Sequence, residues 1–258
     1  MATHHINIKK TGAVAISALV ITYMAMFRPA LSMHISGAVL GGILPALFWL
    51  WFWLQEDKAH PEPKKIIFEA FFLGMIAVPF AIIIEKFLMG SSGGELSLLL
   101  FFAWAVTEET LKYFGAFIAG IRTKYFDEPI DVVMYMISSA LGFAALENVL
   151  FIYNSAILTN ASMIPLRFIG ASLLHVACSA LIGFGIGFGI GKSNKIRLIY
   201  LFTGLFASFA LHTAFNYFIM ITEGKYLLSI FMLLWLVIVL ILLLFEKIKR
   251  VPFYTMAR

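Results

Sequence analysis

The sequence of 258 residues is 62% hydrophobic and only 13% charged, whereas soluble domains carry about 25% charged residues. This composition excludes an ordinary soluble domain and indicates an integral membrane protein that crosses the bilayer several times. Basic loops facing anionic lipid headgroups explain the formal net charge of +5, so the charge predicts no nucleic-acid partner.

Apolar runs long enough to cross about 30 Å of hydrocarbon predict eight transmembrane helices. In chain order these runs cover residues 12–27, 34–54, 66–89, 96–121, 131–153, 166–191, 196–221 and 226–246. The first run follows Lys9 and Lys10, as in a signal peptide, but no small-x-small cleavage pattern comes after it, so we interpret it as a retained anchor. The connections are too short for a soluble domain, and we expect one integral-membrane domain over residues 1–258.

Basic residues of the predicted connections fall mainly on one side of the membrane. Most of the 19 Lys and Arg residues lie near the termini or in the connections around 55–65, 122–130 and 192–195. Because cytoplasmic loops are enriched in Lys and Arg, we place this side and both termini in the cytoplasm. The expected fold is an all-α, polytopic helix bundle in the cell membrane. The single cysteine, Cys178, excludes an intramolecular disulfide.

Three charged residues, Glu108, Glu109 and Lys112, lie near the centre of the predicted helix 96–121. Each central charge costs about 2.5 to 3.5 kcal/mol on the insertion scale, so this helix needs polar partners or a water-filled cavity. Intramembrane ionisable residues with that need are candidates for a functional site. Glu108 and Lys112 are four residues apart, so the lysine can neutralise Glu108. Glu109 is expected to point about 100° away around the helix.

Polar residues of three other predicted helices lie at similar depths. With a rise of 1.5 Å per residue, Glu108 lies about 18 Å below the outer end of its helix. His175 and His212 lie about 14 Å deep, and Glu147 and Asn216 follow at about 8 to 9 Å. We therefore predict that four helices place carboxylate, imidazole and amide groups in one slab between the bilayer midplane and the outer surface.

Three polar residues near this slab are expected to have other roles. Asn148 follows Glu147 and is expected to form hydrogen bonds between helices as a supporting residue. Arg167, at the outer end of helix 166–191, either extends to the headgroups or pairs with a site carboxylate or a substrate carbonyl. Glu85, near the outer end of helix 66–89, is expected to reach the membrane surface.

The types of residue in the slab suit peptide hydrolysis. A carboxylate that activates water, with imidazole and amide groups placed to stabilise an oxyanion, is the minimum apparatus for this reaction. This interpretation needs no cofactor. In an alternative, His175, His212 and Glu147 bind zinc while Glu108 acts as the base. A proton-coupled transporter and a noncatalytic membrane scaffold are two further alternatives, because carboxylate and histidine chains also relay protons.

An ordered set of motifs between about residues 50 and 220 resembles the PrsW family of intramembrane proteases. The motifs are Asp57-Lys58-x-x-Pro61-Glu62-Pro63, Glu108-Glu109-x-x-Lys112, Asp127-Glu128-Pro-x-Asp131, Tyr135, Gly142-Phe143-Ala144-Ala145-x-Glu147-Asn148-x-x-x-x-Tyr153, Arg167, His175 and His212-x-x-x-Asn216. The resemblance implies a relation to the CAAX prenyl endopeptidases and bacterial Abi proteins. Two features depart from that wider group. Glu147 replaces the histidine of a Phe-x-x-x-His motif. This chain has Lys112, whereas the wider group often has an arginine one position later.

The resemblance implies an activity and a substrate class. It implies cleavage of a membrane-anchored, single-pass anti-sigma factor near the outer membrane face, the site-1 cut of a regulated cascade. It also implies that the Glu108–Glu109 pair supplies the catalytic base. We expect catalytic roles for six residues and supporting roles for Lys112, Asn148 and Arg167. The six are Glu108, Glu109, Glu147, His175, His212 and Asn216.

Overall fold

The computed structural model describes residues 35–154, 163–223 and 225–251, and within these ranges it describes side chains from residue 37 onward except those of 154 and 163–169. Seven α-helices and no strands occur in these ranges. The helices are α2 (Ile35–Trp53), α3 (Lys64–Ser91), α4 (Leu98–Ala116), α5 (Pro129–Asn154), α6 (Met163–Gly189), α7 (Asn194–Ile221) and α8 (Leu227–Ile248), and a π-helical turn, Phe117–Ile121, extends α4.

The seven helices coincide with seven of the eight predicted spans, and the all-α membrane fold is confirmed. The predicted helix 12–27 lies outside the described residues, so a total of eight stays a prediction. Five helices, α3 and α5 to α8, are long and apolar enough to cross a membrane. α4 carries three charged residues, and all three are buried.

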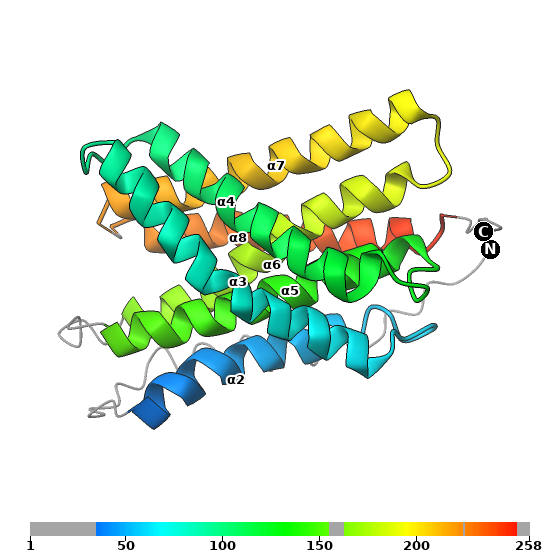
Figure 1. The fold of residues 1–258 in the computed structure, drawn as a ribbon, viewed down its shortest axis with the longest axis horizontal. Helices are drawn as coiled ribbons and strands as arrows, with labels where there is room; N and C mark the ends of the chain where they lie inside the picture. Colours follow the sequence, from blue (N-terminus) through cyan, green and yellow to red (C-terminus); the bar gives the residue numbers. More distant parts are fainter. Residues whose placement is uncertain (1–34, 155–162, 224, 252–258) are drawn as a thin grey trace.

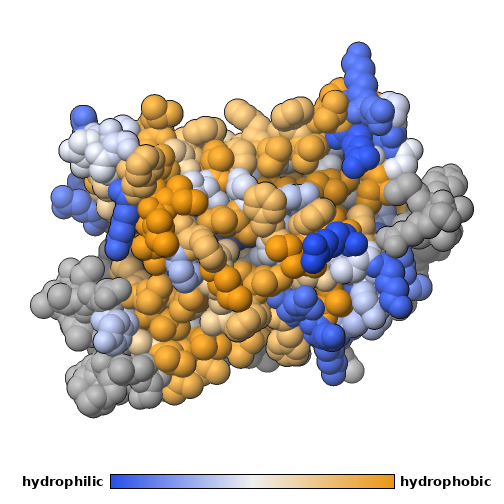
Figure 2. Space-filling view, viewed as in Figure 1, coloured by the Kyte–Doolittle hydropathy of each residue, from blue (hydrophilic) through white to orange (hydrophobic). Residues whose placement is uncertain are grey.

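The surface and the helix order agree with a membrane orientation. An apolar band covers the middle of the molecule, and polar residues gather at its two ends (Figure 2). Successive helices run back and forth between these ends, and the connections at 54–63, 122–128 and 190–193 share the right-hand end (Figure 1). These connections contain or adjoin most of the basic residues, so this end corresponds to the predicted cytoplasmic side.

α5 is the central helix of the bundle. Within its membrane-spanning part 94% of the residues are buried, against 28% in α7 and in α8. α5 contacts α2, α3 and α6, and glycines allow α3 to approach it closely. A Cβ atom on Gly142 would lie 1.8 Å from the Phe71 carbonyl oxygen, and one on Gly74 would lie 1.9 Å from that of Ser139. Only glycine permits this backbone contact.

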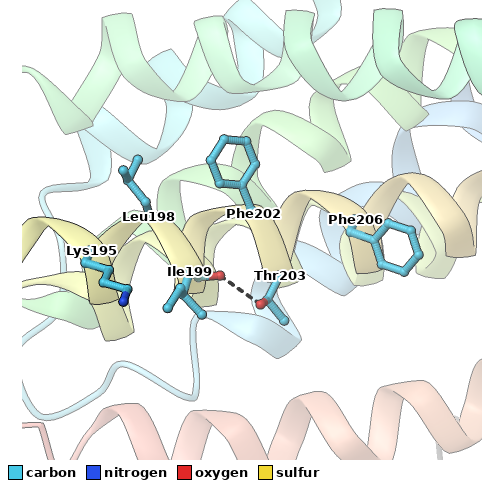
Figure 3. A pocket seen from close by; sticks show the side chains of 6 residues that line it. All are labelled: Lys195, Leu198, Ile199, Phe202, Thr203 and Phe206. Carbon is cyan, nitrogen blue, oxygen red and sulfur yellow. Dashed lines mark hydrogen bonds between the residues drawn. The ribbon is translucent and has the colours of Figure 1, made fainter.

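The outer surface of α7 has a shallow apolar hollow (Figure 3). It is lined by Leu198, Ile199, Phe202 and Phe206, with Lys195 at one end. The hydroxyl of Thr203 donates to the Ile199 carbonyl at 2.8 Å, so it is not available as a polar group for a ligand. This hollow contains none of the predicted site residues, and its apolar lining suits contact with lipid.

Candidate active site

Four helices bring charged and polar side chains together inside the bundle. α4 contributes Glu108, Glu109 and Lys112, while α6 and α7 contribute His175 and His212. All five side chains are buried, and Glu109, Lys112 and His212 have no exposed surface. Glu147 of α5 lies at the edge of this group, with 34% of its side chain exposed. Because the charged groups meet partners from other helices, α4 can lie inside an apolar bundle.

Lys112 lies at the centre of the group. Its ammonium is 3.1 Å from Glu108 Oε2, 2.7 Å from Glu109 Oε1 and 2.7 Å from His175 Nδ1. These contacts use all three of its donors, and the ammonium also lies 4.3 Å from the centroid of the Phe143 ring. Sequence analysis paired Lys112 with Glu108 alone. The structure gives Glu109 the shorter contact, because side chains three residues apart also meet on a helix.

The contacts of His175 fix its tautomer. An ammonium can only donate, so Nδ1 of His175 accepts from Lys112, and the ring proton is on Nε2. Nε2 lies 2.8 Å from Glu147 Oε2 and donates to it. Glu147 thereby orients the imidazole of His175 from the side opposite Lys112.

His212 is oriented by a second carboxylate. Its Nδ1 lies 3.0 Å from Glu109 Oε1, and the other oxygen of Glu109 accepts from the Ser179 hydroxyl at 2.7 Å. With Nδ1 donating to Glu109, Nε2 carries a lone pair. This Nε2 atom is buried and has no hydrogen-bond partner among the described residues.

Glu108 lies between the two imidazoles. Its Oε2 is 3.7 Å from His175 Nδ1 and 3.7 Å from His212 Nε2. The atoms of these three residues that could bind a metal all lie within 4.8 Å of one another. Ligands of tetrahedral zinc, at 2.0 to 2.2 Å from the ion, lie about 3.3 to 3.5 Å apart. A carboxylate on the second nitrogen of each histidine is the usual arrangement behind a zinc site.

The spacing of these ligand atoms therefore fits a zinc ion, and the unpartnered Nε2 of His212 supports the fit, while the Lys112 ammonium lies against the other two ligand atoms. The set differs in one member from the set suggested by the sequence. Glu108 lies with the two histidines, whereas Glu147 contacts the other nitrogen of His175 and would support a ligand rather than be one.

The sequence interpretation missed one carboxylate. Glu85 of α3 was expected to extend to the membrane surface, but its carboxyl group lies near that of Glu108 and interacts with it electrostatically. Its Oε1 is buried without a hydrogen-bond partner in the described structure, and its backbone carbonyl accepts from the Trp104 indole at 3.4 Å. Depth along a single helix did not reveal this contact. The location of Glu85 inside an apolar run was the signal in the sequence that it belongs to the buried group.

The other predicted residues lie away from the centre of the group. The amide of Asn148 is buried and donates to the Ser172 hydroxyl at 3.3 Å, so it joins α5 to α6. Asn216 is half-buried one turn beyond His212. The side chain of Arg167 lies outside the described part of the structure.

Two apolar hollows lie between α4 and α7. One, of about 690 Å³, extends from Glu109 past Tyr113 and Phe117 toward the predicted cytoplasmic end, with Leu201 and Leu205 on its α7 side. There α4 and α7 diverge (Figure 1). The other hollow, of about 740 Å³, lies toward the opposite end. It is lined by Leu98, Leu99, Phe102, Ala210, Thr213, Ala214, Tyr217 and Phe218. The boundary between α4 and α7 is therefore hollowed on both sides of the charged group.

Comparison with known proteins identifies relatives over most of the chain. The protease PrsW of Bacillus subtilis (strain 168) is 30% identical over 205 residues, which cover 76% of this chain and 90% of that protein. The protease PrsW of Geobacillus kaustophilus (strain HTA426) is 28% identical over 204 residues, covering 76% of this chain and 87% of the relative. No solved structure matches.

A family comparison matches residues 62–244 to the PrsW family intramembrane metalloproteases. The matched region contains the whole charged group of α4 to α7. The relatives are peptidases by name, which favours an enzyme over the transporter and scaffold alternatives. The apolar helices agree with a location in the cell membrane. The chain therefore belongs to the PrsW family of intramembrane metalloproteases.

Proposed function

We propose that the charged group formed by α4 to α7 is the catalytic site and hydrolyses a peptide bond of a single-pass membrane protein. The main support is the pair of histidines that face Glu108. Each has a carboxylate on its other nitrogen, from Glu147 for His175 and from Glu109 for His212. Such preorganisation of buried imidazoles is typical of a site that does chemistry.

Glu108, His175 and His212 are the residues that would bind zinc in this site. A bound zinc ion supplies a Lewis acid for the scissile carbonyl and lowers the pKa of water toward neutrality. Glu109 holds His212 in the tautomer that presents Nε2, and Lys112 neutralises the buried carboxylates. Glu85 and Glu147 are the carboxylates of the group that keep some exposure, so they are placed to exchange a proton with water or substrate.

One observation supports hydrolysis without a metal. The Lys112 ammonium lies 2.7 Å from His175 Nδ1, on the nitrogen that a metal would need. In this second candidate mechanism Glu108 takes the proton from water, assisted by Glu109 and Glu147. His175, His212 and Asn216 would then bind the scissile carbonyl or its oxyanion.

The substrate is inferred from the family resemblance and from access to the site. Members of the family resembling this chain cleave anti-sigma factors anchored by one membrane segment, and we propose a substrate of this kind cut near the outer face. The apolar hollows between α4 and α7 support lateral approach of a transmembrane segment from the lipid.

The test is cleavage of a single-pass reporter by the purified protein in detergent. Wild type, Glu108→Gln and His212→Ala are compared with and without a strong chelator, and bound metal is measured in each. We expect zinc in wild type, its loss in His212→Ala, and cleavage that the chelator abolishes and added zinc restores. Chelator-resistant cleavage that still requires Glu108 would support the metal-free mechanism. Equal cleavage by wild type and Glu108→Gln would contradict the proposed site.

A further inference from the structure

Two acidic motifs of the sequence have no role in the site described so far. Residues 57–63 connect α2 to α3, and residues 127–131 lead into α5. Both segments lie at the predicted cytoplasmic end of the bundle (Figure 1). They meet there, because one carboxylate oxygen from each of Asp57, Glu62 and Asp131 lies within 4.8 Å of the others.

Two of these three carboxylates are buried and incompletely bonded. Asp57 is 5% exposed and Asp131 is fully buried. Oδ2 of Asp131 accepts from the backbone N–H groups of Asp127 and Glu128, at 2.9 and 2.6 Å. Oδ1 of Asp131 and Oδ2 of Asp57 have no hydrogen-bond partner among the described residues. Buried carboxylate oxygens without a partner are costly, which indicates a ligand that the side chains do not supply.

Further oxygen atoms surround the third carboxylate. The Tyr135 hydroxyl donates to Glu62, and this hydroxyl also lies 3.1 Å from the Tyr125 carbonyl oxygen. The carboxylates and the phenol are hard oxygen ligands, and the group of residues placed together here contains no histidine or cysteine. Such a set suits Mg²⁺ or Ca²⁺ rather than zinc.

The described residues leave the negative charge of this cluster largely uncompensated. Burial, together with the charges of Asp131 and Glu128, raises the pKa of Asp57 to about 7. Burial also raises the pKa of Glu62 to about 7. The charge of Lys249 acts in the opposite direction on Asp57, but its ammonium forms its ion pairs with Glu56 at 2.7 Å and with Glu246 at 3.0 Å.

We propose that Asp57, Glu62 and Asp131 bind a hard divalent cation, such as Mg²⁺ or Ca²⁺, at the cytoplasmic end of the bundle. The ion joins the α2–α3 connection to the first turn of α5, the central helix. It is separate from the zinc site proposed above, because it shares no ligand with it. Its role is to fix the position of α5 relative to α3.

The test uses the full-length protein in detergent, stripped of metal, and measures thermal unfolding while Mg²⁺ or Ca²⁺ is added. At pH 8 we expect a saturable rise in Tm for wild type. Asp57→Asn and Glu62→Gln should each weaken cation binding at least about tenfold, the loss seen even for outer-shell partners of metal sites. Glu69→Gln is the matched control, because it removes an exposed acid of α3 and keeps the three ligands, so it should respond like wild type.

Competition with protons gives a second readout. Carboxylates bind a cation in their ionised form, so protons compete with the cation for Asp57 and Glu62. The cation should therefore stabilise more at pH 8 than at pH 6, while the cation-free protein should gain stability as the pH falls. Mn²⁺ bound in a His212→Ala background should show no coupling to imidazole nitrogen in electron spin-echo spectra.

Three results would overturn the proposal. One is the absence of a saturable Tm shift up to about 10 mM cation, a concentration above the weakest range of protein Ca²⁺ sites. Another is an equal shift in wild type and Asp57→Asn. The third is stabilisation by acid alone with no effect of cation at pH 8, which would mean that shared protons occupy the cluster.

Discussion

At the scale of single residues, the charge balance of the buried charged group depends on Lys112. Its ammonium is fully buried and is shared among two carboxylates and one imidazole. Breaking a buried ion pair by removing one partner costs more than removing both, because the remaining charge stays buried without compensation. This asymmetry can be measured with Glu109 and Lys112, which both lie on α4.

We expect Glu109→Gln and Lys112→Met each to lower the free energy of unfolding by about 3 to 5 kcal/mol. The double variant should recover part of that loss, since Glu109 and Lys112 then no longer leave each other unpaired, while Glu108 still lacks its ammonium partner. Denaturant titration in detergent measures all four proteins of the cycle. Glu95→Gln, at an exposed acid in the α3–α4 connection, should unfold like wild type. Additive losses in the double variant would show that the pair is not coupled.

A second prediction at this scale concerns Glu85, which contacts Glu108. If Glu85 exchanges a proton during hydrolysis, Glu85→Gln should lower kcat by about 10²-fold or more, with little change in KM or in Tm. Lys86→Gln changes the exposed neighbouring charge and should leave turnover unaltered. A normal kcat in Glu85→Gln would assign the residue to packing alone.

At the scale of elements, the helices could be predicted because crossing a bilayer requires a minimum apolar length. The predicted range 66–89 became Lys64–Ser91, and 226–246 became Leu227–Ile248. The convergence of Glu108, His175 and His212 also followed from their depths along the helices. Depth alone says nothing of rotation about a helix axis, so the contact of Glu85 with Glu108 and the shorter pairing of Glu109 with Lys112 needed the three-dimensional arrangement.

The packing of α3 on α5 gives a prediction for a whole element. Because a Cβ on Gly142 would overlap the Phe71 carbonyl oxygen, Gly142→Ala should push the two helices apart and lower Tm. It should also lower activity, since α5 carries Glu147 and α3 carries Glu85. Gly90→Ala is the control: no atom lies within 4 Å of its Cβ position, and the residue is in a helix. Alanine there should be neutral or stabilising by up to about 1 kcal/mol. Equal Tm values for the two variants would contradict close α3–α5 packing as the constraint.

At the scale of the whole molecule, the charged group is enclosed by α5 and α6 on one side and faces the boundary between α4 and α7 on the other. α5 is almost entirely buried, whereas α7 is mostly exposed. The apolar hollows on both sides of the charged group lie along this boundary. A transmembrane substrate approaching from the lipid would therefore reach the histidines between α4 and α7 without leaving an apolar surface.

A bulky side chain in the outer hollow between α4 and α7 should block the substrate without changing the charged group. Ala210 lines the outer hollow and its side chain is exposed, so Ala210→Trp should fold normally and occupy the space next to α4. We expect cleavage of a membrane-anchored reporter to fall at least about tenfold, mainly through KM, because binding energy is lost while the reacting groups are intact. Val239→Trp adds the same ring on the exposed face of α8, at a lipid-facing position away from the α4–α7 boundary. This variant should cleave normally. If both variants cleave like wild type, the substrate enters by another route; if both fail, the added ring disturbs the bundle rather than the path. A loss confined to Ala210→Trp would place substrate entry between α4 and α7.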